Sequence, residues 1–277
     1  MQAAYAQAEH LPIEKLHPFE DHPFQVNDDA EMDQLVWSIL TQGLLTPLVV
    51  RPRENGEYEV ISGHRRLRAC QRAGIGTVPA LVCPMDRDAA AIALVDSNLH
   101  RERILPSEKA FAYRMKMEAL KHQGTSVQVG PKLTAAGIAE NESASQVKRY
   151  IRLTNLTPEL LTMVDQGRIA LNPAVELSYL RPEEQAHLLE AMEWADCTPS
   201  LSQAVQMKKL SQSGQLTAER ISTMMEEPKA NQAEKISFRT EDLRSYFPRS
   251  YSAARMQEVI LKLLRDYQKK RQRDLSR

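Results

Sequence analysis

The chain has few cysteines, no net charge and no long apolar segment, and each absence narrows what it can be. Its three cysteines, Cys70, Cys83 and Cys197, are odd in number and widely spaced, which favours a reducing compartment over a disulfide framework. No cysteine stands in a CxxC pair and the histidines lack metal-ligand spacing, so a zinc site is not expected. The N-terminus has neither a basic lead-in nor a long apolar run. We therefore expect no signal peptide and no membrane span, and a cytoplasmic location.

The charges cancel over the whole chain. The 36 basic residues equal the 36 acidic ones, so any attraction to nucleic acid must come from local basic patches. A length of 277 residues with 42% hydrophobic residues is enough for about two domains with ordinary cores.

The first half of the chain has the pattern of a mixed α/β domain. We expect a flexible arm at residues 1–10 and a domain at 11–124. The predicted elements are a strand in 11–19, a helix in 28–43, strands at 47–52 and 57–63 around an Asn55-Gly56 turn, a helix at 64–73, a strand at 78–85, and helices at 88–100 and 106–123, with Ser107 as the N-cap of the last.

The second half is predicted to be helical. Residues 125–225 begin with the pattern of a helix-turn-helix: a helix at 134–139, a polar turn at 140–143 and a second helix from about Ser145. The further helices of this bundle are predicted at 158–166, 173–179, 182–194 and 201–211, several with proline in the first turn.

A polar linker at 226–234 precedes a C-terminal segment at 235–277. This segment begins strand-like and ends in a helix with an apolar stripe from Met256 to Leu264. The stripe indicates either a partner helix in a homodimer or the core of a small domain. The basic tail from Lys269 either contacts phosphates or is a solvated terminus.

The stretch "SGHRRLRA" at 62–69 is a candidate anion site. Gly63 lies at a strand-to-helix turn, where backbone N–H groups can approach an anion closely. Arg65, Arg66 and Arg68 follow on the first turns of the helix, and guanidinium groups bind phosphate oxygens in a bidentate manner. The alternative is a solvated arginine face on an amphipathic helix.

Two other stretches support the anion site. In "SNLHRERILPSEKA" at 97–110, Asn98 offers an oxygen to a hydrated cation and Arg101 a further phosphate donor, although Asn98 would also serve as a helix cap. Gly43 is followed by Thr46-Pro47, a third loop of small and turn-forming residues.

Together, "GLLTPLVVR" (43–51), "SGHRRLRA" (62–69) and "SNLHRERILPSEKA" (97–110) resemble the ParB/RepB family of plasmid and chromosome partition proteins. The order and spacing fit, and the resemblance extends through the helix-turn-helix, over roughly residues 11–180. It implies an α+β N-terminal domain of the ParB/sulfiredoxin-like fold, an all-α helix-turn-helix domain, and a small C-terminal α/β or helical segment.

In that family the N-terminal domain binds CTP with Mg²⁺. The resemblance implies that Gly63, Arg65 and Arg66 hold phosphates, that Asn98 places Mg²⁺ and that Arg101 supports the pocket. Gly43 and Pro47 would shape its opposite wall, and Thr46 and His64 complete the expected nucleotide-binding set.

This sequence departs from the family pattern at three positions of the pocket. Thr46 stands where the family usually has Gln, His64 where it has Glu, and Ser97 where it has a Glu beside the metal-site Asn. Two carboxylates are therefore lost, which weakens Mg²⁺ binding and leaves at most a weak CTPase.

The second helix of the helix-turn-helix is expected to enter the major groove of double-stranded DNA. Its predicted DNA-binding residues are Ser145, Gln146, Lys148, Arg149 and Arg152, with Gln146 as the base reader, since Gln pairs with adenine. The alternative is an ordinary helical hairpin with a basic, solvated face.

The leading hypothesis is a sequence-specific partition protein of a plasmid or integrative element. It would act as a CTP-gated dimeric clamp on a centromere-like DNA site, with a ParA-type ATPase partner, at the nucleoid in the cytoplasm. The alternatives are a plain helix-turn-helix transcriptional regulator with a scaffold-only N-terminal domain, and a sulfiredoxin-like phosphotransfer enzyme, for which the nearest thiol is Cys70.

Overall fold

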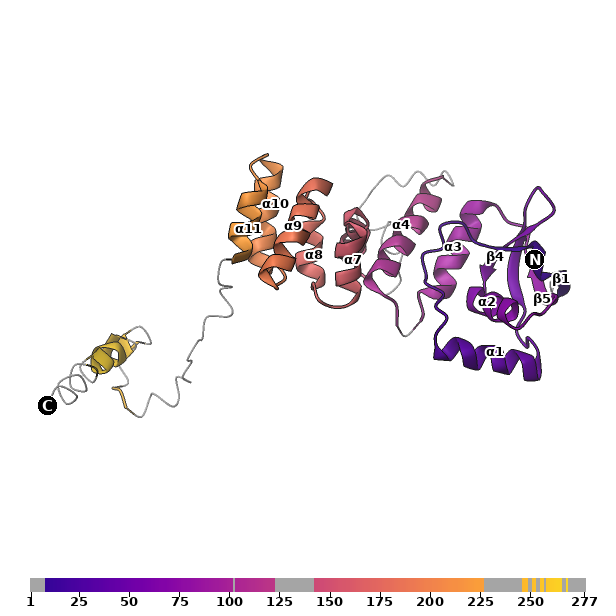
Figure 1. Ribbon diagram of the computed structural model, residues 1–277, viewed down its shortest axis with the longest axis horizontal. Coiled ribbons are helices and arrows are strands. Elements are labelled where there is room, and N and C mark those ends of the chain that lie inside the picture. The colour runs from indigo at the N-terminus through magenta and orange to yellow at the C-terminus, as the bar shows by residue number, and fades with distance from the viewer. Residues whose placement is uncertain are drawn as a thin grey trace. The chain divides into compact units, whose positions relative to one another are not determined.

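The computed structural model describes residues 8–226 except 102 and 123–141, together with 246–248, 251–252, 255–256, 258–265 and 268. The chain separates into two compact units, 1–227 and 228–277. The first contains a sheet with helices on both faces and then a series of packed helices (Figure 1).

The sheet has five strands in the order β1-β5-β3-β4-β2. Neighbouring pairs alternate between antiparallel (β1 with β5, β3 with β4) and parallel (β5 with β3, β4 with β2). The strands are β1 Glu9–Pro12, β2 Leu16–Pro18, β3 Leu48–Pro52, β4 Tyr58–Ser62 and β5 Thr77–Val82.

The single strand predicted in 11–19 is wrong. A 3-10 turn, η1 Ile13–Lys15, divides this stretch into β1 and β2, which lie at opposite edges of the sheet. Pro12 has a φ of −60° and no N–H for a ladder, so a strand ends there. Glu9 and His10, predicted to belong to the arm, pair with β5.

The helices α1 Ala30–Gln42, α2 His64–Arg72 and α3 Arg87–Asn98 lie where the sequence predicted helices. The side-chain alternation along β4 sends Val60 into the core shared with α1 and α2, and Ile61 into the core shared with α3. Asp29 caps α1 by accepting from the Met32 N–H at 2.8 Å.

Helix α4, Pro106–His122, packs against α3 and also against the helices that follow. Ser107 is not its N-cap: it lies within the first turn and is buried. Its backbone N–H and hydroxyl donate to the two oxygens of Asp165, at 2.9 and 2.5 Å. The carboxylate that satisfies this helix start therefore comes from a distant helix.

The remaining helices of the first unit are α6 Ala144–Arg152, η2 Leu153–Asn155, α7 Pro158–Asp165, α8 Leu171–Leu177, α9 Pro182–Ala195, α10 Leu201–Gln212 and α11 Ala218–Glu226. The 3-10 turn η2 and helices α7 to α11 share one apolar core, against which Tyr150 of α6 packs. Helix α11 was not predicted. The predicted helix at 134–139 and most of the following turn lie outside the described residues, so the domain boundary near 124 stays a prediction.

In the second unit, residues 255–256 and 258–265 are helical. Met256 is buried, whereas Leu263 and Leu264 are 61% and 57% exposed. None of the described helices in either unit has the length and apolar character needed to cross a membrane.

Candidate functional site

The turn from β4 into α2 is built around Gly63. Its φ of 105° lies in the left-handed region, which favours glycine. A Cβ at this position would lie 2.6 Å from Leu48 Cδ2, too close without a rearrangement. The turn therefore requires glycine, as an anion-binding strand-to-helix turn does.

Arg66 fastens the loop after α1 to this turn. Its guanidinium donates to the carbonyl oxygens of Thr46 and Pro47, at 2.5 and 2.9 Å, and burial lowers its pKa. The loop begins at Gly43, which ends α1 with a φ of 73°. The structure thus brings together predicted site residues from two separate sequence motifs.

Arg68 and Arg72 belong to an ion-paired face between α2 and the start of α1. Arg68 pairs with Asp28 at 2.6 Å, and Arg72 pairs with Asp33 at 2.6 Å. The alternative interpretation of a surface arginine face is therefore correct for Arg68.

Arg65 makes longer contacts with the same acidic segment, 3.3 Å to Asp29 and 3.4 Å to Glu31. Burial lowers the pKa of Arg101, the charge of Glu108 opposes this shift, and the charge of Arg65 lowers the pKa further. Glu108 and Arg65 thus act on Arg101 with opposite sign, and an anion that contacted both arginines would be favoured.

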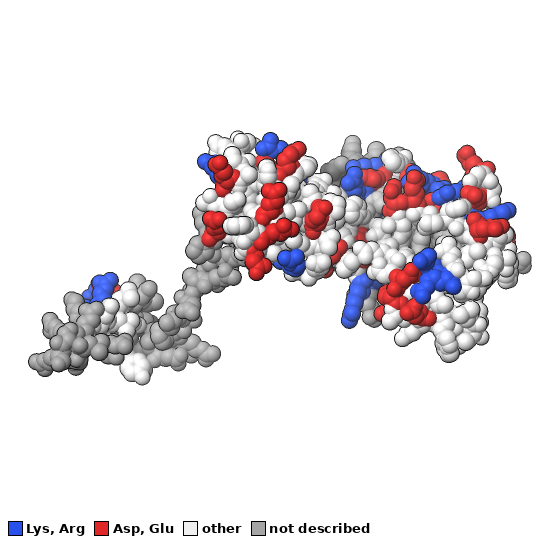
Figure 2. Space-filling model, in the orientation of Figure 1, with Lys and Arg blue, Asp and Glu red and all other residues white. Residues whose placement is uncertain are grey.

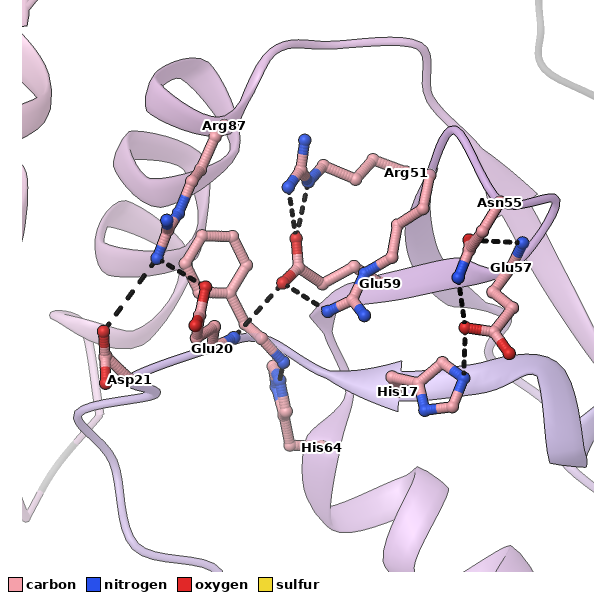
Figure 3. Close-up of polar contacts among 11 residues, drawn as sticks. His17, Glu20, Asp21, Arg51, Asn55, Glu57, Glu59, His64 and Arg87 are labelled. Atoms are coloured by element: carbon pink, nitrogen blue, oxygen red, sulfur yellow. Dashed lines mark hydrogen bonds and ion pairs between the residues drawn. The ribbon is translucent and has the colours of Figure 1, made fainter.

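His64 is 7% exposed, and its ring makes hydrogen bonds that hold neighbouring segments of the fold together. Its Nε2 accepts from the Phe19 N–H at 3.2 Å (Figure 3), and the ring also hydrogen bonds to the Val60 backbone. The His22 ring stacks on it with centroids 3.7 Å apart. Burial, followed by the charges of His22 and Arg101, lowers the pKa of His64 to about 3.

Asn98 is buried at the C-terminal end of α3. Its amide nitrogen donates to the Leu94 carbonyl at 2.8 Å and to Ser97 Oγ at 3.2 Å, while Ser97 itself donates to Leu94. The Arg101 N–H closes the turn on the Asn98 carbonyl at 3.1 Å. The side chain is thus held by its own helix, and Oδ1 is the one side-chain atom that it offers to a cation.

Glu108 is a site residue that the sequence analysis missed. It is 8% exposed, and its two oxygens accept from the N–H groups of Gln25 (2.8 Å) and Leu105 (2.9 Å). It therefore ties the loop after β2 to the start of α4. The signal was present in "PSEKA", because a Glu three residues after a helix boundary is typical of a cap.

The segment after β2 is held in place by a second acidic residue, Glu59 of β4. This buried carboxylate pairs with Arg51 (2.6 Å) and Arg53 (2.9 Å) and accepts from the Glu20 N–H at 3.2 Å (Figure 3). Consecutive backbone N–H groups, of Phe19 and Glu20, are thus fixed to α2 and β4 beside the anion turn.

Two features lie apart from this turn. A cavity of about 630 Å³ between α3 and α4 shares Phe19 with the surroundings of the turn, and its other lining residues include Arg87 and Phe111. Cys70 is fully buried in α2, and burial raises the pKa of its thiol. A buried thiol of raised pKa is a poor nucleophile, which argues against the phosphotransfer enzyme.

Helix α6 presents part of the predicted DNA-binding surface. Its N-cap Ser143 accepts from the Gln146 N–H at 3.2 Å, and Val147 is buried against Tyr113. Ser145 and Lys148 are exposed, and Gln146 is half-buried. These residues lie on the surface of the helix, as a recognition helix requires.

The two arginines of α6 have protein partners. Arg149 hydrogen bonds to the Asn172 side chain. Arg152 donates to the Ser178 carbonyl at 3.2 Å and stacks 3.7 Å from the ring centroid of Tyr179, with Lys208 at 3.8 Å. Arg152 therefore fastens α6 to the end of α8, a role that the sequence alone did not indicate.

Comparisons with known proteins agree with the sequence resemblance. Residues 1–99 match the family model of the ParB N-terminal domain. The chromosome-partitioning protein Spo0J of Thermus thermophilus is 35% identical over 177 residues, which are 63% of this chain and 61% of that protein. The chain thus spans less than two thirds of that relative.

Two crystal structures of C-terminally truncated ParB from Caulobacter crescentus are also similar. The structure in complex with the centromeric parS site is 25% identical, with a TM-score of 0.42, over 78% of this chain and 98% of that one. The structure in complex with CTP-γ-S is 29% identical, with a TM-score of 0.32, over 65% of this chain and 95% of that one.

Proposed function

We propose that this chain, whose residues 1–99 match the family model of the ParB N-terminal domain, is a DNA-binding partition protein of a plasmid or integrative element whose binding to DNA is gated by CTP. The similarity to a chromosome-partitioning relative supports the general role. A homodimeric clamp, a centromere-like DNA site, a ParA-type ATPase partner and a location at the nucleoid are further parts of the proposal.

The glycine turn at Gly63, with Arg65 in the first turn of α2 and Arg101 just after α3, supports the nucleotide part. The left-handed glycine leaves the start of α2 without a Cβ, which would lie 2.6 Å from Leu48 Cδ2. A triphosphate would bridge the two cations and accept from the backbone N–H groups of the turn.

The resemblance also implies Mg²⁺, held through Asn98. The described donors do not form a divalent-cation site, because Asn98 contributes one neutral oxygen and its neighbour Ser97 has no carboxylate. Magnesium prefers one or two carboxylates, so no step of the proposed function is assigned to it.

The nucleotide proposal is tested by thermal unfolding with and without CTP. We expect CTP to raise the unfolding temperature of the full chain, and Arg65→Ala to abolish the increase by removing one of the two arginines of the proposed site. Arg68→Ala is the matched control: it lies on the same helix, is ion-paired to Asp28 and is 47% exposed. A CTP response that survives in Arg65→Ala would contradict the assigned site.

A plain transcriptional regulator is the second candidate, and one observation favours it. The acidic start of α1 contacts Arg65, Arg68 and Arg72, as expected of a domain that serves only as a scaffold. Footprints confined to promoter sites, together with no CTP response in the unfolding assay, would support the regulator.

A further inference from the structure

The donor set at the anion turn indicates how the nucleotide's charge is neutralised, and this inference rests on the proposed nucleotide site. The family pattern places Glu beside the Gly of the turn and Glu beside the metal-site Asn, whereas this chain has His64 and Ser97. The structure shows what these two replacements do.

His64 cannot substitute for a metal-ligating carboxylate. A metal needs the lone pair of an imidazole nitrogen, but Nε2 accepts from the Phe19 N–H and the ring is also bonded to the Val60 backbone. The side chain is buried under His22. His64 therefore positions the turn and leaves no donor for a cation.

Ser97 and Asn98 provide few ligand atoms for a metal ion. The Ser97 hydroxyl donates to the Leu94 carbonyl and accepts from the Asn98 amide. Mg²⁺ would find a single neutral oxygen, Asn98 Oδ1, and a hydroxyl already bonded within the helix. Within the described part of the chain, no group of three or more His, Cys, Asp or Glu side chains is arranged to hold a metal.

Among the residues that the structure describes, Glu108, Asp29 and Glu31 around the turn already have partners. Both oxygens of Glu108 accept backbone N–H groups, and Asp29 and Glu31 contact Arg65. Asp29 in addition accepts from the Met32 N–H as the cap of α1. Recruiting any of them as a metal ligand would remove a contact that shapes the site.

Two arginines lie at the turn, Arg65 in the first turn of α2 and Arg101 just after α3. The contacts of Arg65 with Asp29 and Glu31 are long, 3.3 and 3.4 Å. The phosphates of a nucleotide would be attracted to these guanidinium groups without a metal.

We propose that this site binds a nucleoside triphosphate through Arg65 and Arg101 without a divalent cation, and that it retains the nucleotide intact. The guanidinium groups replace the charge that Mg²⁺ supplies elsewhere. Without a metal-held phosphate the terminal phosphoryl group is not activated toward water, so the DNA clamp would open when the nucleotide dissociates.

The test measures CTP affinity by calorimetry on the full chain, with Mg²⁺ and with EDTA, and phosphate release in parallel. For the wild type, the dissociation constants of CTP measured with Mg²⁺ and with EDTA should agree within about threefold. This is a difference of less than about 1 kcal/mol in binding free energy. Phosphate release should not exceed that of the protein-free control.

The designed gain of function is Ser97→Glu, which restores a carboxylate beside Asn98 at an exposed position. It should make binding at least about tenfold tighter with Mg²⁺ than with EDTA. Ser97→Gln is the control of matched size without charge and should behave as the wild type.

Three results would overturn the inference. A wild-type protein that binds CTP at least about tenfold tighter with Mg²⁺ has a working metal site. Phosphate release above background shows that the nucleotide is hydrolysed. Absence of CTP binding under both conditions would also overturn the proposed function, whereas the first two results would leave nucleotide binding intact.

Discussion

At the scale of single residues, the histidine pair shows how surroundings decide a role. The resemblance placed His64 among the nucleotide ligands and left His22 without a function. In the structure the two rings stack, and His64 is a neutral connector between α2, β4 and the segment after β2. Desolvation lowers the pKa of His22 to about 4 and that of His64 to about 3.

This pair predicts a loss of stability in mild acid. The ordinary pKa is 6.5, so below that pH the unfolded chain binds protons that the folded chain does not. The contribution of the two neutral histidines to the stability of the fold is complete above about pH 6.5. It decreases as the pH falls toward the pKa values of the folded state. We expect a loss of about 2 kcal/mol per histidine in the free energy of unfolding at about pH 5.

Urea unfolding at about pH 7 and pH 5 checks this expectation. His22→Phe keeps a ring against His64 but removes one titrating group, so it should lose about half of the pH dependence. His187→Gln, at an exposed position of α9, should retain all of it. Equal wild-type stability at the two pH values would argue against a buried neutral pair.

At the scale of elements, the first turn of α4 joins three parts of the first unit. Ser107 bonds to Asp165 of α7, and Glu108 to the Gln25 N–H of the loop after β2. Lys109 pairs with Glu142, just before α6, at 2.7 Å. Three consecutive residues thus connect the candidate nucleotide site with the helices that carry the candidate DNA surface.

We predict that Asp165→Ala destabilises the first unit by about 1–3 kcal/mol, because it leaves the buried Ser107 hydroxyl and N–H without their acceptor. In a double-mutant cycle with Ser107→Ala, the coupling energy should be about 1 kcal/mol or more. Glu159→Ala, exposed on the same helix α7, should change little. Strictly additive losses in the cycle would show that the contact does not contribute.

At the scale of the whole molecule, the balance of charge determines how DNA could be bound. The chain has no net charge, and acidic and basic side chains are interspersed on the face shown in Figure 2. Long-range attraction to DNA is therefore weak, and under the proposed function local contacts on α6 would provide the affinity.

We predict that two α6 substitutions affect DNA binding differently. Lys148→Ala should weaken binding to all sequences and reduce the slope of log affinity against log salt by about 1. Gln146→Ala should cost about 1–3 kcal/mol on the preferred sequence and relax the preference at one base pair.

Fluorescence anisotropy over a salt series, on a DNA site selected from random sequence, measures both effects. Lys209→Ala, exposed on α10, is the control for loss of a distant positive charge. If Gln146→Ala weakened binding equally on every sequence, Gln146 would be a positioning contact rather than a base reader.

Local signals in the sequence were sufficient to predict the turn and most of the helices around the candidate site. Gly63 was predicted from its place between a strand and an arginine-bearing helix, and its φ of 105° confirms the turn. The helix predicted in 28–43 is confirmed as α1, which has Asp29 as its N-cap and Gly43 as its C-cap. Periodicity also placed most helices, since the apolar face of each helix repeats over a few residues.

The sequence by itself determined which elements form and which residue types stand at each turn, because caps, glycine turns and apolar periodicity act over a few neighbouring residues. The tertiary structure decided which groups these side chains contact. Arg66 bonds to carbonyl groups 20 and 19 residues away, Ser107 to a carboxylate 58 residues away, and Arg152 stacks on Tyr179. Whether an arginine or histidine can reach a ligand depends on which groups folding brings beside it, and no local pattern encodes those distances.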